Sequence, residues 1–367
     1  MTALIAMDVA GRADRLRAAL DGAGCDALVV THPTNIRYLT GFTGSAAVLV
    51  VGADGLVFVT DGRYEEQAAD QLAAAGVSAD IGVGRTAAEQ RAIVSRHLAA
   101  TARVGLEAEH VTWAEERRFA DTWFPSAELV ATSGLVEDLR IVKDDGEIDR
   151  IAAACAIADD ALSAVLPLLA DGPTERGFAL ALDAEVRHRG ADDVSFETIV
   201  ASGPNGSRPH HEPGGRAIEP GDLVVIDFGA LVDGYHSDMT RTIPVGGLGV
   251  LDPTQRRMVE VVTASQAAGV AAVRAGGSAR AVDAACRAVI EEAGWGEAFV
   301  HGTGHGVGLD IHEAPGVSGS SDATLAPGHV VTVEPGVYLP GHGGVRVEDT
   351  VVVTADGSRT LTCAPKP

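Results

Sequence analysis

Four carboxylates stand on strand-like segments, three of them within or directly after short runs of mostly aliphatic residues, and this pattern restricts the fold more than any other feature. Asp227 interrupts the run Leu223–Ala230, and Glu334 follows Val330–Val333. Runs of this length and composition are typical of buried strands. A buried carboxylate without a partner is costly. A fold that buries these strands must therefore supply each acid with a cation, a proton or a hydrogen-bond donor.

A short turn lies between the first two of these acids. Asp233-Gly234 is a strong signal for a two-residue β-hairpin turn. Such a turn pairs Val232 with Tyr235, and this register sets Asp227 and Asp238 diagonally on one face of the hairpin. Two carboxylates so close repel one another unless a cation or a proton lies between them.

The same pattern recurs near the C-terminus, where Glu348 ends the run Val345-Arg346-Val347. One such acid is explained well enough by a salt bridge or by a place on an edge strand. Four together favour a carboxylate cluster that holds cations.

A glycine-rich segment carries a candidate nitrogen ligand. In His301–Gly308 glycine occupies every second position, and His305 lies in its middle. Such a loop lets backbone and side chain approach a ligand closely. Its spacing is not that of a dinucleotide-binding motif, and a tight turn with exposed histidines is the alternative. One imidazole with several carboxylates suits Mn²⁺, Co²⁺ or Zn²⁺ better than a structural zinc site does. Two such ions sharing carboxylates promote hydrolysis.

Charge and composition restrict the function classes. The net charge of −23 disfavours nucleic-acid binding, which needs a basic face. The four cysteines are far apart, which indicates neither zinc nor redox motifs and fits a reducing compartment. The N-terminus has no basic segment typical of a signal peptide, and no apolar stretch approaches membrane-spanning length. We therefore expect a cytoplasmic protein with no membrane association.

The chain of 367 residues is long enough for two domains. Residues 1–140 alternate strand-like and helix-like segments, including a hairpin over 47–59, a helix over 63–75 and a strand over 103–106, which predicts a small α/β domain. Residues 141–367 begin with helices over 148–169 and 175–189. Strands over 198–201, 223–230 and 235–243 follow. Asp252-Pro253 predicts the start of a helix that ends near 275, and Ser278 predicts the cap of the next. Strands and turns follow, so this part is expected to be an α+β domain.

Several segments together resemble the proline-peptidase branch of the pita-bread metallopeptidase family (M24), which contains Xaa-Pro dipeptidase (prolidase) and aminopeptidase P. The thirteen residues His301–Glu313 closely match the signature of this branch, and the remaining ligand motifs match in the expected order. The matching segments are 225–227, 236–242, 332–336 and 344–349, with 35–42 and 61–64 in the first domain. The resemblance covers most of the chain. It implies a creatinase-like N-terminal α/β domain and a pita-bread catalytic domain.

The resemblance implies a site with two divalent metal ions, most plausibly Mn²⁺ or Co²⁺, with Zn²⁺ as a third option. Asp227 is expected to chelate one ion, His305 and Glu334 the other, and Asp238 and Glu348 to bridge both. Glu334 is also expected to shuttle a proton.

The resemblance assigns further residues to the substrate side. His210, His301 and His312 match histidines beside the substrate, and Arg346 matches an arginine that pairs with a carboxylate; a core histidine and a neutralising arginine are the alternatives. The chain has His211 where family members often have a smaller residue, so both neighbouring histidines are candidates to face the substrate. His236, His329 and His342, with His211, are interpreted as structural or surface residues.

The implied activity is hydrolysis of the peptide bond before proline, in peptides with proline at the second position, by a homodimer. A creatinase-like hydrolase that needs no metal, and a non-catalytic binding protein with the same fold, are the alternatives. The complete ligand set argues against both. The sequence does not distinguish a dipeptidase from an aminopeptidase.

Overall fold

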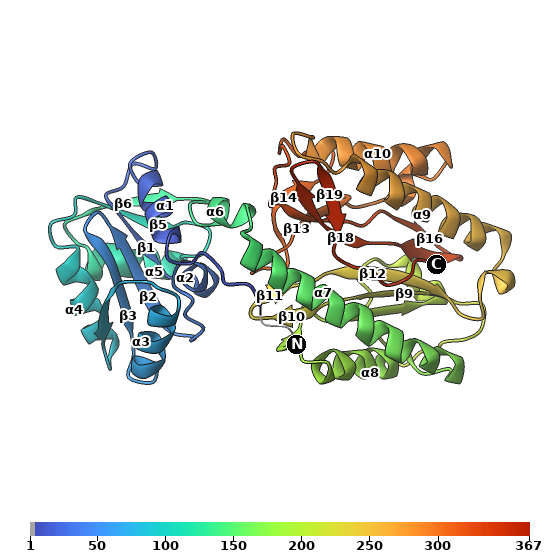
Figure 1. Cartoon of the computed structure of the whole chain (residues 1–367), viewed down its shortest axis with the longest axis horizontal. Helices are drawn as coiled ribbons and strands as arrows, with labels where there is room; N and C mark the ends of the chain where they lie inside the picture. Colours follow the sequence, from blue (N-terminus) through green and yellow to red (C-terminus); the bar gives the residue numbers. More distant parts are fainter. Residues whose placement is uncertain (1–3) are drawn as a thin grey trace. The chain divides into compact units, whose positions relative to one another are not determined.

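The structure is a computed structural model that describes residues 4–367. The chain divides into two compact units. Met7–Arg140 forms the smaller unit, and Ile141–Pro367 forms the larger one together with residues 4–6. Figure 1 shows the smaller unit in blue to green and most of the larger one in green to red.

The smaller unit is built around one six-stranded mixed sheet with the order β4-β3-β2-β1-β5-β6. Strands β1, β5 and β6 are parallel neighbours, and β1, β2 and β3 pair antiparallel. Its elements are α1 (Arg12–Ala19), β1 (Ala27–Val30), α2 (Pro33–Thr40), β2 (Ala47–Gly52), β3 (Gly55–Thr60), α3 (Glu65–Ala74), β4 (Asp80–Val83), α4 (Ala87–His97), β5 (Arg103–Glu107), α5 (Trp113–Arg118), η1 (Phe119–Trp123), β6 (Glu128–Thr132) and α6 (Glu137–Ile141). The predicted hairpin, helix and strand are therefore confirmed, and so is the α/β class.

The larger unit contains helices and short antiparallel sheets, as predicted for an α+β fold. Its elements are α7 (Asp145–Val165), η2 (Leu166–Asp171), α8 (Glu175–His188), β7 (Asp193–Val194), β8 (Ile199–Ser202), η3 (Gly203–Ser207), β9 (Leu223–Phe228), β10 (Ala230–Val232), β11 (Tyr235–His236), β12 (Met239–Pro244), η4 (Leu248–Val250), α9 (Pro253–Ala272), α10 (Ala279–Glu292), η5 (Gly296–Ala298), β13 (Gly304–Gly306), β14 (Glu313–Val317), β15 (Val330–Val333), β16 (Gly336–Leu339), β17 (Gly343–Arg346), β18 (Asp349–Thr354) and β19 (Gly357–Thr360).

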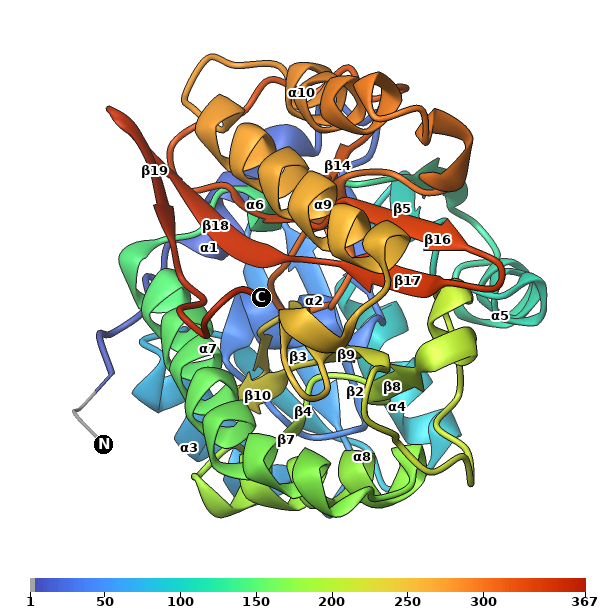
Figure 2. The same cartoon turned by 90° about the vertical axis from the view of Figure 1, so that its right-hand side faces the viewer.

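Two pairs of helices enclose the strands of the larger unit. Figure 2 shows α7 and α8 on one side and α9 and α10 on the other, with strands between them. Apolar residues of α7 and α8 pack with those of β8, β9 and β12 in one core. Residues of α9 and α10 pack with those of β15 to β18 in a second core. The strands are thus held from both sides, and the polar face of each can border a site.

The turn between β10 and β11 has the predicted residues and register. Asp233 and Gly234 both have positive φ, 45° and 74°, as a type I′ turn requires. Val232 pairs with Tyr235, and the same register continues into the pairing of β9 with β12.

The predicted start of α9 is also confirmed. Asp252 accepts hydrogen bonds from the backbone of Thr254 and Gln255, with Pro253 in the first turn. Ser278 occupies the N-cap position of α10, but within the described chain its side chain makes no capping hydrogen bond. The predicted position of the cap is thus confirmed and the predicted side-chain cap is wrong; the backbone of Ser278 forms an isolated bridge with Thr324.

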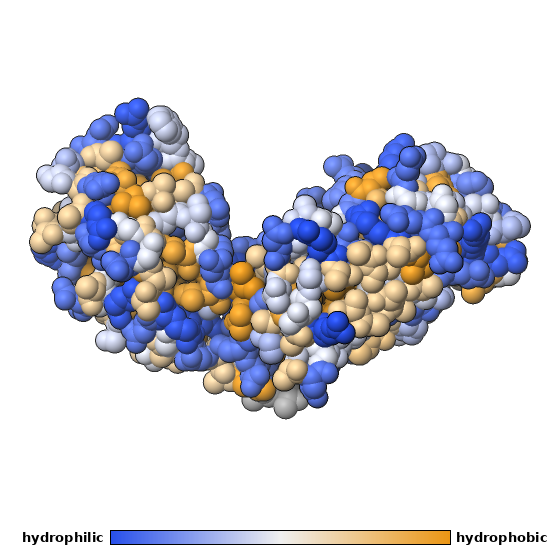
Figure 3. All heavy atoms as spheres, turned by 90° about the horizontal axis from the view of Figure 1, so that it is seen from above, coloured by the Kyte–Doolittle hydropathy of each residue, from blue (hydrophilic) through white to orange (hydrophobic). Residues whose placement is uncertain are grey.

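The helical stretch Asp145–Asp171 is, by length and composition alone, long and apolar enough to cross a membrane. The expectation that no stretch approaches this length is therefore wrong. Ile151, Ala154, Ala158 and Leu162 on this stretch are buried, and all but the first belong to the core that it forms with α8 and the strands. It is thus a core helix of the unit. Figure 3 shows hydrophilic residues over much of both units and a broad, weakly hydrophobic area on the larger one.

Candidate metal centre and active site

A cleft of about 520 Å³ in the larger unit brings together all nine residues predicted from the sequence. They are His210, Asp227, Asp238, His301, His305, His312, Glu334, Arg346 and Glu348. They come from segments more than a hundred positions apart, so only the fold assembles them. The cleft is a set of acids and imidazoles within a largely apolar wall, which is the usual chemistry of a ligand site.

The alternation of β9 places Asp227 in this cleft. Val224, Ile226 and Phe228 point into the core under α7 and α8, so Asp227 faces the opposite side of the strand. Thr240 of β12 is its partner in the ladder. Asp238 lies directly before β12, where the ladder is interrupted. At this point Gly229 and the backbone of Ser237 approach closely, and a Cβ on Gly229 would lie 1.9 Å from the Ser237 carbonyl oxygen.

The alternating glycines around His305 serve close packing of the backbone. A Cβ on Gly304 would lie 2.0 Å from the carbonyl oxygen of Thr332, and one on Gly306 would lie 2.3 Å from that of Ala314. These glycines allow β13 to pack closely between β14 and β15. Close approach to neighbouring strands is thus one reason for these glycines, and close approach to a ligand stays a prediction.

The imidazole of His305 is oriented as a ligand through Nε2. Its Nδ1 lies 3.0 Å from the carbonyl oxygen of Gly306, so Nδ1 carries the proton and Nε2 is left as the acceptor. Nε2 lies 3.4 Å from Glu334 Oε1 and 3.5 Å from Asp238 Oδ2. Burial lowers the pKa of His305 to about 4, which keeps the ring neutral at neutral pH.

The four carboxylates repel one another. Burial, then the nearby charges of Glu348, Asp227 and Glu334, raise the pKa of Asp238 well above its ordinary value. Burial and neighbouring acids likewise raise the pKa of Glu348, and burial raises that of Glu334 to about 7.

Two carboxylate oxygens in the cluster have no hydrogen-bond donor among the described residues. Asp227 Oδ1 and Glu348 Oε1 are buried and have no hydrogen-bond partner among residues 4–367. Asp238, His305 and Glu348 also offer ligand atoms within 4.8 Å of one another. Unsatisfied oxygens, mutual repulsion and one neutral imidazole together fit divalent cations.

Arg346 is the cation that the chain itself supplies. Its NH2 group lies 2.5 Å from Asp227 Oδ2, its Nε donates to Thr240 Oγ1, and its NH1 donates to the hydroxyl of Tyr338 at 2.9 Å. Thr240 in turn donates to Glu348 Oε2 at 2.7 Å. One guanidinium cannot neutralise four acids, so the alternative reading of Arg346 as a simple neutraliser leaves most of the charge unexplained.

His301 joins this network through Tyr338. Its Nδ1 lies 2.8 Å from the carbonyl oxygen of Gly302, and its Nε2 lies 2.9 Å from the Tyr338 hydroxyl. Because Tyr338 accepts from Arg346, its own proton is available for His301 Nε2. Burial lowers the pKa of His301 to about 4. Tyr338 lies on β16, which is labelled in Figure 1.

His312 lies against His305, with ring centroids 4.4 Å apart. The segment that carries it is tied to the start of α7. Lys143 Nζ lies 2.9 Å from Glu313 Oε2, and both side chains are buried. Glu313 Oε1 accepts from the backbone of Asp310. This buried ion pair fixes the approach of His312 to the cleft.

Glu175 distinguishes the two neighbouring histidines. Its fully buried carboxylate accepts from Ser202, Asn205 and the backbone of Gly214, and lies 2.9 Å from His211 Nε2. Burial alone would raise its pKa, but these hydrogen bonds lower it to about 2. His211 is therefore held by Glu175, and the ring of His210 is the one free of that restraint at the cleft.

His236, His329 and His342, which the sequence interprets as structural or surface residues, contact structural partners. His236 Nδ1 lies 2.9 Å from Ser195 Oγ. His329 accepts from the backbone of Ala326, and His342 pairs with Asp252 near the surface.

Three of the residues described above were not predicted: Tyr338, Glu175 and Lys143. Tyr338 stands between Val337 and Leu339 on β16, and nothing in the sequence marks it as a functional residue. Lys143 stands in the polar segment that the sequence interprets only as a boundary. Acidic residues are common in the first turn of helices, so the sequence does not distinguish Glu175, the first residue of α8, from an ordinary helix-terminal acid.

Comparisons with known proteins agree with this geometry. Residues 149–355 match the model of metallopeptidase family M24, and residues 12–142 match the creatinase/prolidase N-terminal domain. The chain belongs to metallopeptidase family M24. It is therefore a peptidase, of a family that uses divalent metal ions.

Similar proteins include an Xaa-Pro dipeptidase from Pyrococcus furiosus, 34% identical over 96% of this chain and 97% of that protein. An Xaa-Pro dipeptidase structure from Bacillus anthracis is 39% identical, covers 97% and 98% of the two chains, and has a TM-score of 0.92. An X-Pro aminopeptidase structure from Thermotoga maritima is 30% identical, covers 97% and 99%, and has a TM-score of 0.87. The resemblance to the proline-peptidase branch and the predicted fold class are both confirmed.

Proposed function

We propose that the protein hydrolyses the peptide bond before proline, with two divalent metal ions held by Asp227, Asp238, His305, Glu334 and Glu348. The observation that carries the proposal is the cleft itself. It joins two buried carboxylate oxygens that have no partner among residues 4–367 to an imidazole turned toward the acids. Relatives at 34% and 39% identity bear the name Xaa-Pro dipeptidase.

Metal ions in such a site supply Lewis acidity and a nucleophilic water at neutral pH. The bond before proline is a tertiary amide without an N–H, so a mechanism that polarises the carbonyl group and does not rely on that donor suits it. Asp227 would hold one ion, His305 and Glu334 would hold the other, and Asp238 and Glu348 would be shared by both.

Glu334 is the proposed proton carrier. Its carboxyl group has a pKa of about 7 in the metal-free protein, and Thr332 Oγ1 donates to its Oε1. A carboxylate in this position would take a proton from water and give it to the leaving nitrogen of proline.

The remaining cleft residues bind and orient the substrate. His210, His301 and His312 line the cleft with Arg346. Arg346 keeps Asp227 in place through a charge-assisted hydrogen bond, and His301 presents an imidazole held by Tyr338. Phe196, Pro209 and Ile311 add apolar wall, which suits a proline ring.

The proposal extends to metal identity, assembly and location. We infer Mn²⁺ or Co²⁺ as the native ion, with Zn²⁺ as the alternative, because oxygen ligands predominate. We also propose a homodimer, a cytoplasmic location, and two domains divided near residue 140, as 1–140 and 141–367. Sedimentation at micromolar concentration tests the dimer, since a monomer there refutes it.

Substrate length is the first question to test. Rates on an Xaa-Pro dipeptide are compared with rates on the matching Xaa-Pro-Yaa tripeptide and on an Xaa-Ala dipeptide. The proposal expects cleavage of at least one proline peptide and much slower cleavage of Xaa-Ala. Preferential cleavage of the alanine peptide overturns it. The ratio of the first two rates separates dipeptidase from aminopeptidase.

A further inference from the structure

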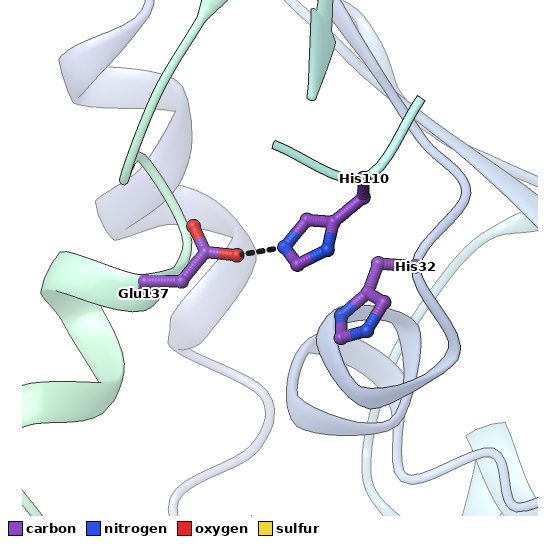
Figure 4. Close-up of side chains that lie close together, drawn as sticks. All are labelled: His32, His110 and Glu137. Atoms are coloured by element: carbon purple, nitrogen blue, oxygen red, sulfur yellow. Dashed lines mark hydrogen bonds and ion pairs between the residues drawn. The ribbon is translucent and has the colours of Figure 1, made fainter. Parts of the chain in front are cut away.

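The smaller unit contains a second group of metal-ligating side chains, far in sequence from the cleft residues. Among residues 4–367, two groups of three such residues have ligand atoms within 4.8 Å of one another. One is Asp238, His305 and Glu348 in the cleft. The other is His32, His110 and Glu137, shown in Figure 4.

The topology of the sheet assembles this second group. Strands β1, β5 and β6 are adjacent and parallel. His32 follows β1 as the N-cap residue of α2, His110 follows β5, and Glu137 follows β6 as the first residue of α6. All three therefore lie beyond the carboxyl ends of parallel strands, which is where ligands bind in open α/β sheets.

The ligand atoms of the group lie close enough together for one ion. His110 Nε2 lies 2.8 Å from Glu137 Oε1. The rings of His32 and His110 are stacked, with centroids 3.7 Å apart and planes 8° from parallel. Figure 4 shows the His110 ring between the Glu137 carboxylate and the His32 ring. The lone pair of an imidazole nitrogen lies in the ring plane, so binding of one ion requires the two rings to turn out of this parallel stack.

Hydrogen bonds around the group hold its members in place. Asn35 is buried and donates to Glu137 Oε1 at 2.6 Å, and its own oxygen accepts from Arg140 at 2.8 Å. The backbone N–H of His32 donates to Glu107 Oε2 at 2.9 Å. Oriented ligands of this kind are what metal sites use to fix their first coordination sphere.

We propose that His32, His110 and Glu137 bind one Zn²⁺ ion, separate from the metal centre of the cleft. Two imidazoles and one carboxylate form a ligand set that zinc adopts, with a fourth position open to water. The ion takes the place of the proton in the hydrogen bond between His110 and Glu137, and that proton is released to solvent. The bound ion links the segments after β1, β5 and β6 and so stabilises the smaller unit.

The test counts zinc in the full-length protein. Wild type, His110→Gln, His32→Gln and a control, His97→Gln, are equilibrated with Zn²⁺ by dialysis, and metal per chain is measured by elemental analysis. His97 is an exposed histidine of the same unit. We expect each cluster variant to bind one ion fewer than wild type, and the control to match wild type. The same deficit is expected in an Asp238→Asn background, which separates this site from the cleft.

Equal zinc content in wild type and in both folded cluster variants overturns the proposal. If the variants do not fold, crystals of wild-type protein soaked in Zn²⁺ decide. An anomalous difference peak among the three side chains supports the site, and peaks in the cleft alone contradict it. Peptidase activity of the His110→Gln variant serves as a check on folding, because the cluster is not part of the proposed catalytic machinery.

Discussion

Arg346 lies 2.5 Å from Asp227 through one guanidinium nitrogen and 2.9 Å from Tyr338 through another. Asp227 is thereby bound on one oxygen and left with the other buried and unsatisfied among residues 4–367. A carboxylate restrained in this way presents a single lone-pair direction to an incoming cation. The arginine thus acts on the metal centre by orienting a ligand.

Replacing Arg346 with lysine should keep the charge and lose the geometry. A lysine cannot reproduce three directed hydrogen bonds from a planar group. We expect kcat/KM for an Xaa-Pro peptide to fall about 10- to 100-fold, in line with the loss of a partner that orients a ligand. Steady-state kinetics with metal content measured in parallel tests this. Unchanged kinetics in a fully metal-loaded Arg346→Lys variant would show that the orientation is immaterial.

The stability of the metal-free protein should depend on pH in a defined direction. The pKa of Glu334 is raised to about 7, and those of Asp238 and Glu348 are raised well above their ordinary values. Near neutral pH the folded state then binds more protons than the unfolded state, so stability falls as pH rises. The pKa values of His301 and His305 are lowered to about 4. Below their ordinary pKa of 6.5 the unfolded state therefore binds more protons at these two groups, and stability falls as pH falls.

Above about pH 6.5 only the carboxyl groups of this set contribute. Calorimetry of the metal-free protein should therefore show a melting temperature that falls between about pH 6.5 and 8. Saturating Mn²⁺ should remove this fall, because cations stabilise the ionised acids. Glu334→Gln should reduce the slope without metal. A melting temperature that rises over this interval in the metal-free protein contradicts the account.

Glu175 should govern substrate binding although it does not line the cleft. Its carboxylate holds the segment from Ser202 to Gly214 that carries His210. Glu175→Gln keeps the shape and removes the charge that several donors share. We expect KM to rise about tenfold, because hydrogen bonds to a charged group contribute about 1.5–3 kcal/mol, with a smaller change in kcat. Glu185→Gln, at a half-buried acid farther along the same helix that pairs with Arg189, is the control and should keep the KM of wild type. A kcat effect alone would speak against a positioning role.

The ion pair between Lys143 and Glu313 should be strongly coupled. Removing one partner of a buried pair costs about 3–5 kcal/mol, so Lys143→Met should lower the urea midpoint markedly. Glu313→Gln in the same chain should recover part of the loss, since no unpaired charge then remains buried. A double variant less stable than the sum of the two single variants predicts would refute the pairing.

The sequence predicts the fold and the cleft residues well because both depend on local patterns. The Asp233-Gly234 turn sets the register of its hairpin, and that register alone brings Asp227 near Asp238. Tyr338 and Glu175 could not be predicted, because their roles depend on partners distant in the chain. The His32–His110–Glu137 group could not be predicted for the same reason, since only the parallel order of three strands brings its members together.

The central claim is that the five ligand residues make Xaa-Pro hydrolysis depend on metal. The most direct measurement strips metal from purified protein with a chelator, removes the chelator, and follows cleavage of an Xaa-Pro peptide as Mn²⁺ or Co²⁺ is returned. Cleavage should vanish on stripping and return with about two ions per chain at the cleft, and Asp238→Asn should not recover. Full cleavage by the stripped protein, or by Asp238→Asn, would contradict the account.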